Sequence, residues 1–224
     1  MIGWPTAQPE RVAPALAPLL AAVPGAAPVL ALRGVTRAHA GRPVWAPLDL
    51  TLAPATLALV TGSNGAGKTT LLRLAAGLLR PTDGERECAG RALFVRGGGG
   101  LRSAQTVRDA VATTAALAGR RAQAPAAIRL LGLEALAGRR VGTLSAGERV
   151  RAALAAAVAC GPALLCLDEP TAVLDERGLA DLVDVLRSVR NGGAAVLVAT
   201  HQPEPLLAAA DARLVISDGR VRLA

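Results

Sequence analysis

The sequence predicts an α/β domain built on a mostly parallel central sheet, and three observations predict it. From residue 29 onward, short apolar runs of strand character alternate with amphipathic stretches of helical spacing. One of these runs leads directly into a glycine-rich loop and then into a helix. The 224 residues are 52% apolar and 19% charged, which suits one globular domain with a large core and excludes a disordered chain.

Residues 1–28 are predicted to form a flexible or extended N-terminal arm ahead of a domain that spans residues 29–224. The segment Ala13–Leu32 is apolar, but it contains four prolines that forbid a continuous helix: Pro14, Pro18, Pro24 and Pro28. The early prolines, and Glu10 beside Arg11, also argue against a signal peptide. Because no other run reaches about 18 uninterrupted apolar residues, we expect no membrane span, and any membrane role must come through a partner.

The first half of the domain is predicted to place three strands ahead of a phosphate-binding loop. Residues 29–35 and 48–52 have strand character, and a third apolar run over residues 57–61 ends at the loop. The loop has the spacing Gly-x4-Gly-Lys-Thr, whose glycines let backbone N–H groups surround a phosphate at a helix N-terminus. Its residues are Gly62, Ser63, Asn64, Gly65, Ala66, Gly67, Lys68, Thr69 and Thr70.

Lys68 is the only lysine among the 25 basic side chains, and all the others are arginine. An ammonium is a compact point charge that fits between two phosphates, whereas a guanidinium is larger and forked. We therefore expect Lys68 to contact the β- and γ-phosphates of a nucleotide and the Thr69 hydroxyl to bind Mg²⁺.

The second half of the domain carries two carboxylates at the end of a predicted buried strand. The apolar run over residues 163–167 is followed by Asp168 and Glu169, and another apolar run is followed by His201. Ligands bind at the carboxyl ends of parallel strands. A strand-end turn with solvated acids is the alternative interpretation of the two carboxylates.

Together these segments resemble the ATP-binding subunits of ABC transporters, over roughly residues 29–224. Five motifs occur in the family's order: the Gly62–Thr70 loop, the LSGGQ-like Leu144–Glu148, the strand that ends in Asp168 and Glu169, Ala172–Asp175, and Thr200-His201. The resemblance implies a P-loop NTPase fold of ABC type, with an antiparallel β edge and a small helical subdomain around residues 103–138. It implies ATP and Mg²⁺ as ligands.

The resemblance also implies roles at matched positions. Asp168 is similar to the aspartate that holds Mg²⁺ through water, and Glu169 to the base that orients and activates the attacking water. His201 matches the family's switch histidine, which contacts the γ-phosphate. A metal-linked carboxylate beside a freer one suits phosphoryl transfer.

Ser145 has two interpretations. Ser145-x-x-Glu148 has the spacing of a helix capping box, which alone would account for both residues. In the family, the same helix N-terminus points across a head-to-tail dimer at the γ-phosphate held by the other subunit, which gives Ser145 and Gly147 a binding role. Both interpretations require an exposed, positive helix end.

The sequence departs from the family at two places. The glutamine that binds Mg²⁺ and senses the transmembrane partner aligns near Gly97 or Gly98, within the run Gly97–Gly100, and we expect a mobile loop there with no coordinating side chain. The aromatic residue that stacks on adenine is also missing. His39 lies near its place and Trp45 is a less well-placed candidate, so we expect weak discrimination of adenine.

The remaining segments are predicted to be structural. Lys68 and Ser145 are separated by enough chain for a compact helical subdomain but too little for a long coiled-coil insertion, which argues against the chromosome-maintenance ATPases. Leucines and valines at helical spacing predict one face of a helix that is closed by Asn191-Gly192, and Asp218-Gly219 predicts a terminal hairpin.

The charge distribution bears on partners. Residues 1–130 hold 15 basic and 6 acidic groups, a net charge of +9, and the rest of the chain holds 10 and 11, a net charge of −1. A basic balance suits phosphates, nucleic acid or an anionic membrane. A nucleic-acid ATPase is disfavoured because coiled-coil insertions and zinc-type cysteine spacing are missing from the sequence. Three cysteines without such spacing favour a reducing cytoplasm.

We therefore predict a cytoplasmic ATP-hydrolysing subunit at the inner face of the cell membrane. It would dimerise with a second ATP-binding subunit, identical or different, and drive a separate transmembrane permease. Within the family, the resemblance is closest to the haem-exporter ATP-binding proteins of cytochrome c maturation, through residues 61–74, Leu144–Glu148 and residues 200–203. A catalytically weak partner in a heterodimeric transporter is the alternative, motivated by the missing glutamine and aromatic.

Overall fold

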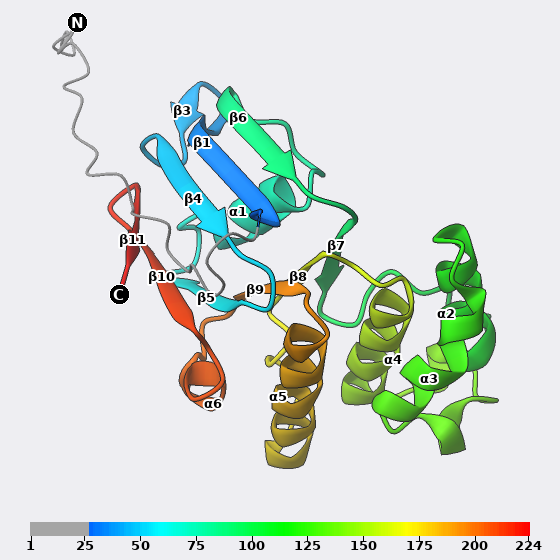
Figure 1. Ribbon diagram of the computed structural model, residues 1–224. Helices are drawn as coiled ribbons and strands as arrows, with labels where there is room; N and C mark the ends of the chain where they lie inside the picture. The colour runs from blue at the N-terminus through cyan, green and yellow to red at the C-terminus, as the bar shows by residue number, and fades with distance from the viewer. Residues whose placement is uncertain (1–26) are drawn as a thin grey trace, which may run out of the picture.

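The computed structural model describes residues 27–224, and the predicted arm over residues 1–28 lies almost wholly outside them. A six-stranded sheet runs through the centre in the order β11-β10-β5-β9-β8-β7 (Figure 1). All of its neighbours pair in parallel except β10 and β11. Its strands are β5 (Leu57–Gly62), β7 (Ala92–Arg96), β8 (Leu164–Asp168), β9 (Ala195–Ala199), β10 (Ala212–Ser217) and β11 (Arg220–Leu223).

A second, antiparallel sheet forms the other layer, in the order β4-β1-β6. Its strands are β1 (Leu30–Thr36), β4 (Leu48–Leu52) and β6 (Asp83–Cys88), and a short ribbon of β2 (Ala38–His39) and β3 (Arg42–Pro43) lies between β1 and β4 in the chain. The predicted fold class, a mostly parallel sheet with an antiparallel β component, is confirmed.

Helices bury both faces of the central sheet. One apolar core joins α1 (Lys68–Ala75) to the antiparallel sheet and to one face of the central strands. The core on the other face includes residues of α4 (Ala146–Ala159), α5 (Glu176–Asn191) and α6 (Glu204–Leu207). Because β8 and β9 are covered on both sides, every one of their residues is buried, and both read as continuous apolar runs in the sequence.

The chain between β7 and α4 is mainly helical. It contains α2 (Val107–Leu117), α3 (Ala124–Leu130) and three short 3₁₀ turns over Arg121–Gln123, Glu134–Leu136 and Val141–Thr143. In Figure 1 these helices pack beside α4, at the β7 edge of the sheet. Thr106 caps α2 by accepting a hydrogen bond from the N–H of Asp109.

Both C-terminal predictions are confirmed. The hairpin forms where predicted, because Asp218 and Gly219 have φ values of 50° and 65° and join β10 to β11. Helix α5 also ends where predicted, with Asn191 as its last residue and Gly192 as its C-cap, and the left-handed residue that follows is Gly193, with φ 94°. Among residues 27–224, no helix combines the length and the apolar character needed to cross a membrane.

Candidate nucleotide-binding site

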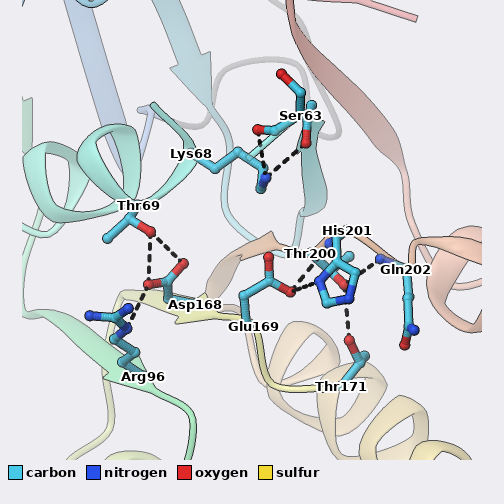
Figure 2. A network of polar contacts seen from close by, with 11 residues as sticks. Ser63, Lys68, Thr69, Arg96, Asp168, Glu169, Thr171, Thr200, His201 and Gln202 are labelled. Atoms are coloured by element: carbon cyan, nitrogen blue, oxygen red, sulfur yellow. Dashed lines mark hydrogen bonds and ion pairs between the residues drawn. The ribbon is translucent and has the colours of Figure 1, made fainter. Parts of the chain in front are cut away.

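The predicted catalytic and metal-binding residues converge at the carboxyl ends of three neighbouring strands. The phosphate-binding loop follows β5, Asp168 and Glu169 lie at the end of β8, and His201 follows β9. Figure 2 shows Lys68, Thr69, Asp168, Glu169 and His201 facing a common space. Parallel pairing therefore brings together side chains that lie up to 133 positions apart in the chain.

Lys68 is the first residue of α1 and is only 7% exposed. Its Nζ donates to the carbonyl oxygen of Gly62 at 2.8 Å and to that of Ser63 at 3.1 Å. These two bonds hold the ammonium at the centre of the loop, where a phosphate would meet it.

The glycines at the two ends of the loop are required by close packing. Gly62 has φ 149°, and a Cβ there would lie 2.5 Å from the carbonyl oxygen of Ile216. Gly67 has φ 104°, and a Cβ there would lie 2.5 Å from Val44 Cγ1 and 2.9 Å from Trp45 Cζ3. Any larger residue would push the loop away from β10 or from the Val44-Trp45 segment.

Thr69 and Asp168 offer a donor set that fits Mg²⁺. The Thr69 Oγ1 lies 3.0 Å from each carboxylate oxygen of Asp168, whose side chain is 2% exposed. Hydroxyl and carboxylate oxygens are the ligands that Mg²⁺ takes at nucleotide sites, usually from one or two protein groups. The two predicted metal-binding residues are therefore adjacent.

The structure adds Arg96, which the sequence did not single out. Arg96 ends β7 in register with Asp168, and its Nε lies 3.4 Å from Asp168 Oδ2. The two residues are 72 positions apart, and only the pairing of β7 with β8 makes them neighbours.

Glu169 and His201 form a direct pair. Glu169 Oε2 lies 2.8 Å from His201 Nδ1 and accepts a second hydrogen bond, of 3.2 Å, from the His201 backbone N–H. Glu169 has φ 52°, an uncommon value for a residue with a side chain. Its N–H donates to the Ala199 carbonyl oxygen at 2.8 Å, which fixes this backbone between β8 and β9. Two buried hydroxyls, those of Thr171 and Thr200, bond at 2.9 Å beside the pair.

Ser145 caps α4 as predicted. Its Oγ accepts from the Glu148 N–H at 3.2 Å, and Glu148 Oε2 accepts from the Ser145 N–H at 2.7 Å. The hydrogen bond from the Ser145 backbone is the main cause of a lowered pKa at Glu148, and Arg139 at 3.6 Å contributes. Because this pKa is lowered on folding, the cap's contribution to stability is lost as pH falls through it.

Ser145 and Gly147 lie apart from the phosphate-binding loop. They line a groove of about 530 Å³ together with residues 173–175, and no residue of Gly62–Thr70 lines it. This chain alone therefore does not bring them to Lys68.

The run Gly97–Gly100 makes contacts that the sequence did not indicate, although three of its four glycines are exposed. Gly98 is buried against the start of α4, and a Cβ there would lie 2.8 Å from the Val150 backbone nitrogen. Gly97 donates its N–H to the Asp168 carbonyl oxygen at 3.2 Å, and a Cβ built on it would have no atom within 4 Å. The sequence could not indicate this contact because it joins segments that are distant in the chain.

These glycines make a matched test. Both have positive φ, 45° at Gly97 and 72° at Gly98, so a side chain at either costs about 1–2 kcal/mol. We expect Gly98→Gln to lose about 1–3 kcal/mol more than Gly97→Gln in the free energy of unfolding, because only position 98 is overpacked. Urea denaturation of both variants measures this difference. Equal losses would mean that the loop does not pack on α4 in solution.

Of the two residues predicted as candidates for the adenine contact, Trp45 is buried and His39 is exposed. Trp45 is 1% exposed and lies behind Gly67 in the core, so its ring cannot stack on a base. Its Nε1 has no hydrogen-bond partner among residues 27–224. His39 is exposed on β2 and stays a prediction.

Comparisons with known proteins agree with this arrangement. Residues 46–172 match the family described as ABC transporter. A cytochrome c biogenesis ATP-binding export protein of Ruegeria pomeroyi is 39% identical over 73% of this chain and 80% of its own length. A ribose import ATP-binding protein of Rubrobacter xylanophilus is 32% identical over 87% of this chain, which spans only 44% of that relative.

Solved structures show the same fold. An ABC transporter described as of metal-chelate type, in an inward-facing conformation, superposes with a TM-score of 0.80 at 26% identity and covers 88% of this chain and 83% of that one. A nucleotide-free ATP-binding cassette superposes with a TM-score of 0.76 at 17% identity, over 87% and 90% of the two chains, and this supports the fold alone. The family match and the relatives show that this chain belongs to the ABC transporter family, as an ATP-binding subunit and thus an ATPase of the kind coupled to transport.

Proposed function

We propose that the chain hydrolyses Mg²⁺-bound ATP in the cytoplasm, as one half of a dimer that drives a separate transmembrane permease. The observation that carries this proposal is the convergence of Lys68, Thr69, Asp168, Glu169 and His201 at one edge of the sheet. These five side chains supply the cation, the metal ligands and the base that phosphoryl transfer requires.

In the proposed mechanism, the loop binds the phosphates and Lys68 exchanges its bonds to the Gly62 and Ser63 carbonyls for phosphate oxygens. Thr69 and Asp168 would hold Mg²⁺, which supplies charge neutralisation and orients the γ-phosphoryl group. Glu169 accepts a proton from the attacking water. His201, already bonded to Glu169 Oε2, fixes the direction of that carboxylate and presents its ring to the γ-phosphate.

A second subunit would complete the site. The N-terminus of α4 carries Ser145 and Gly147 on a groove away from the phosphate loop, and its free backbone N–H groups suit an anion. A head-to-tail dimer would bring this helix end to the γ-phosphate held by the partner. The resemblance of the chain to ABC subunits supports this arrangement.

Ser145 provides a test that separates capping from binding. Ser145→Ala removes the cap and should lower the free energy of unfolding by about 1 kcal/mol. Ser145→Asp keeps a good cap but places a negative charge where the γ-phosphate is expected. We therefore expect Ser145→Asp to keep near wild-type stability and lose most ATP turnover, measured by phosphate release. Full turnover in Ser145→Asp would contradict the binding role.

For the transported substrate we propose haem, exported for cytochrome c maturation. The sequence resemblance and the relatives named for cytochrome c biogenesis export, from Ruegeria pomeroyi and Sphingopyxis alaskensis, support it. The chain reconstituted with its permease in proteoliposomes should hydrolyse ATP faster when haem is added, whereas ribose and an aliphatic sulfonate should have no effect. Stimulation by ribose or the sulfonate and not by haem would reject haem export.

One observation favours a second candidate, a catalytically weak subunit of a heterodimer. No side chain of Gly97–Gly100 can coordinate Mg²⁺ in place of the family's glutamine. Gly97→Gln, which the open space at position 97 permits, tests this candidate. A large rise in Mg²⁺-dependent turnover would favour the weak subunit, and unchanged turnover would favour a competent one.

A further inference from the structure

Arg96 reaches a buried carboxylate from the solvent side. Its side chain is 66% exposed, whereas that of Asp168 is 2% exposed, and the Arg96 Nε lies 3.4 Å from Asp168 Oδ2. Figure 2 shows the guanidinium beside Asp168 on the side away from Glu169, with Thr69 above the same carboxylate. The guanidinium is thus placed at the carboxylate oxygens that a metal ion would need.

Arg96 is the one cationic side chain of residues 27–224 within ion-pair distance of Asp168. The other polar side chain on the carboxylate is the neutral hydroxyl of Thr69. Like charges at such a separation repel, so a guanidinium beside Asp168 opposes the binding of a divalent cation to the same carboxylate.

We propose that Arg96 is a resident counter-cation of Asp168, which must leave before a divalent cation binds and which thereby sets the cation affinity of the site. The inference rests on the proposed function, in which Thr69 and Asp168 hold Mg²⁺. Arg96 acts as a positioning residue through Asp168.

The charges of the site explain why such a residue ties metal binding to nucleotide binding. Without nucleotide, the positive charges of Lys68 and Arg96 balance the negative charges of Asp168 and Glu169, so a divalent cation gains little by entering. The phosphates of a nucleotide add several negative charges and reverse that balance. Removal of the Arg96 charge should therefore strengthen cation binding in both states.

The surroundings of Arg96 allow it to leave. Most of the Arg96 side chain already lies in solvent, so the guanidinium can swing away from Asp168 into water. A Cβ built on Gly97, the next residue, would have no atom within 4 Å, so this side of the loop is open. By contrast, Asp168 is fixed by its burial and by Thr69.

Binding of Mn²⁺, followed by electron paramagnetic resonance of the free ion in the presence of saturating ADP, tests the proposal without any hydrolysis. We expect Arg96→Gln to bind Mn²⁺ about tenfold more tightly than the wild type, because it removes one charge beside Asp168. Arg96→Lys keeps the charge and should stay within about twofold of the wild type. Arg222→Gln removes the same charge from an exposed position on β11, at the opposite edge of the sheet, and should change nothing.

Arg96→Ala is a second variant, with the same expected gain as Arg96→Gln, and thermal melts establish that each variant is folded. Equal Mn²⁺ affinity in the wild type and the folded, uncharged variants would overturn the role of Arg96. Asp168→Asn separates this failure from that of the proposed function. If Asp168→Asn binds Mn²⁺ as tightly as the wild type, the assignment of Asp168 as a metal ligand is wrong. If Asp168→Asn binds Mn²⁺ much more weakly than the wild type, that assignment stands.

Discussion

Lys68→Arg is expected to abolish ATP hydrolysis while leaving the chain folded. Lys68 is 7% exposed and its Nζ lies between two carbonyl oxygens of its own loop, at 2.8 and 3.1 Å. A guanidinium has the same charge but a wider, planar shape, and the loop cannot widen because Gly62 and Gly67 are already in close contact with Ile216 and Trp45. The head group would therefore be displaced from the phosphate position.

The expected loss in turnover is about 100- to 1,000-fold, the usual effect of removing one preorganised electrostatic group. Phosphate release measures it, and a thermal melt shows whether the fold is intact. Lys68→Met removes the charge as well and should be no more active than Lys68→Arg. Wild-type turnover in Lys68→Arg would mean that charge alone suffices and that the shape of the ammonium is irrelevant.

Glu169→Gln is expected to stop hydrolysis and to accumulate an ATP-bound dimer. The carboxamide oxygen of glutamine can still accept the hydrogen bonds from His201 N–H and Nδ1, so the geometry of the pair survives. The carboxamide cannot accept a proton from water, which removes the base and should cost about 100- to 10,000-fold in turnover. Without hydrolysis the bound ATP stays in place and holds the two subunits together.

Light scattering in Mg²⁺-ATP, beside the turnover assay, measures this second effect. Glu134→Gln, which makes the same charge change at an exposed site in the helical segment, serves as the control and should behave as the wild type. Turnover in Glu169→Gln equal to that of Glu134→Gln would remove Glu169 from the role of base.

Much of the fold could be predicted because parallel strands buried on both faces are continuous apolar runs. Residues 48–52 form β4 as predicted, and β5 and β8 begin or end within one residue of the predicted bounds. The site followed from the same logic, since the phosphate-binding loop that leads to Lys68, the pair Asp168-Glu169, and His201 each follow such a run. Parallel pairing then places them together.

The parts that could not be predicted depend on contacts between distant segments. Gly98 packs closely against the backbone of α4, and nothing in a run of four glycines indicates that one of them is packed. Trp45 lies in the core because Gly67 leaves room for its ring. The two residues belong to different segments of the chain, and no local sequence pattern indicates that they are in contact. Arg96 meets Asp168 only through the register of β7 against β8.

Steady-state ATP turnover per chain, measured over a range of chain concentrations in Mg²⁺-ATP, tests the central claim most directly. If two chains must meet to complete each site, turnover per chain should rise with concentration and level off once the dimer predominates. The Glu169→Gln chain should stay inactive throughout. Turnover per chain that is independent of concentration over the range in which light scattering records monomers would contradict the account, and so would the absence of any Mg²⁺-dependent hydrolysis.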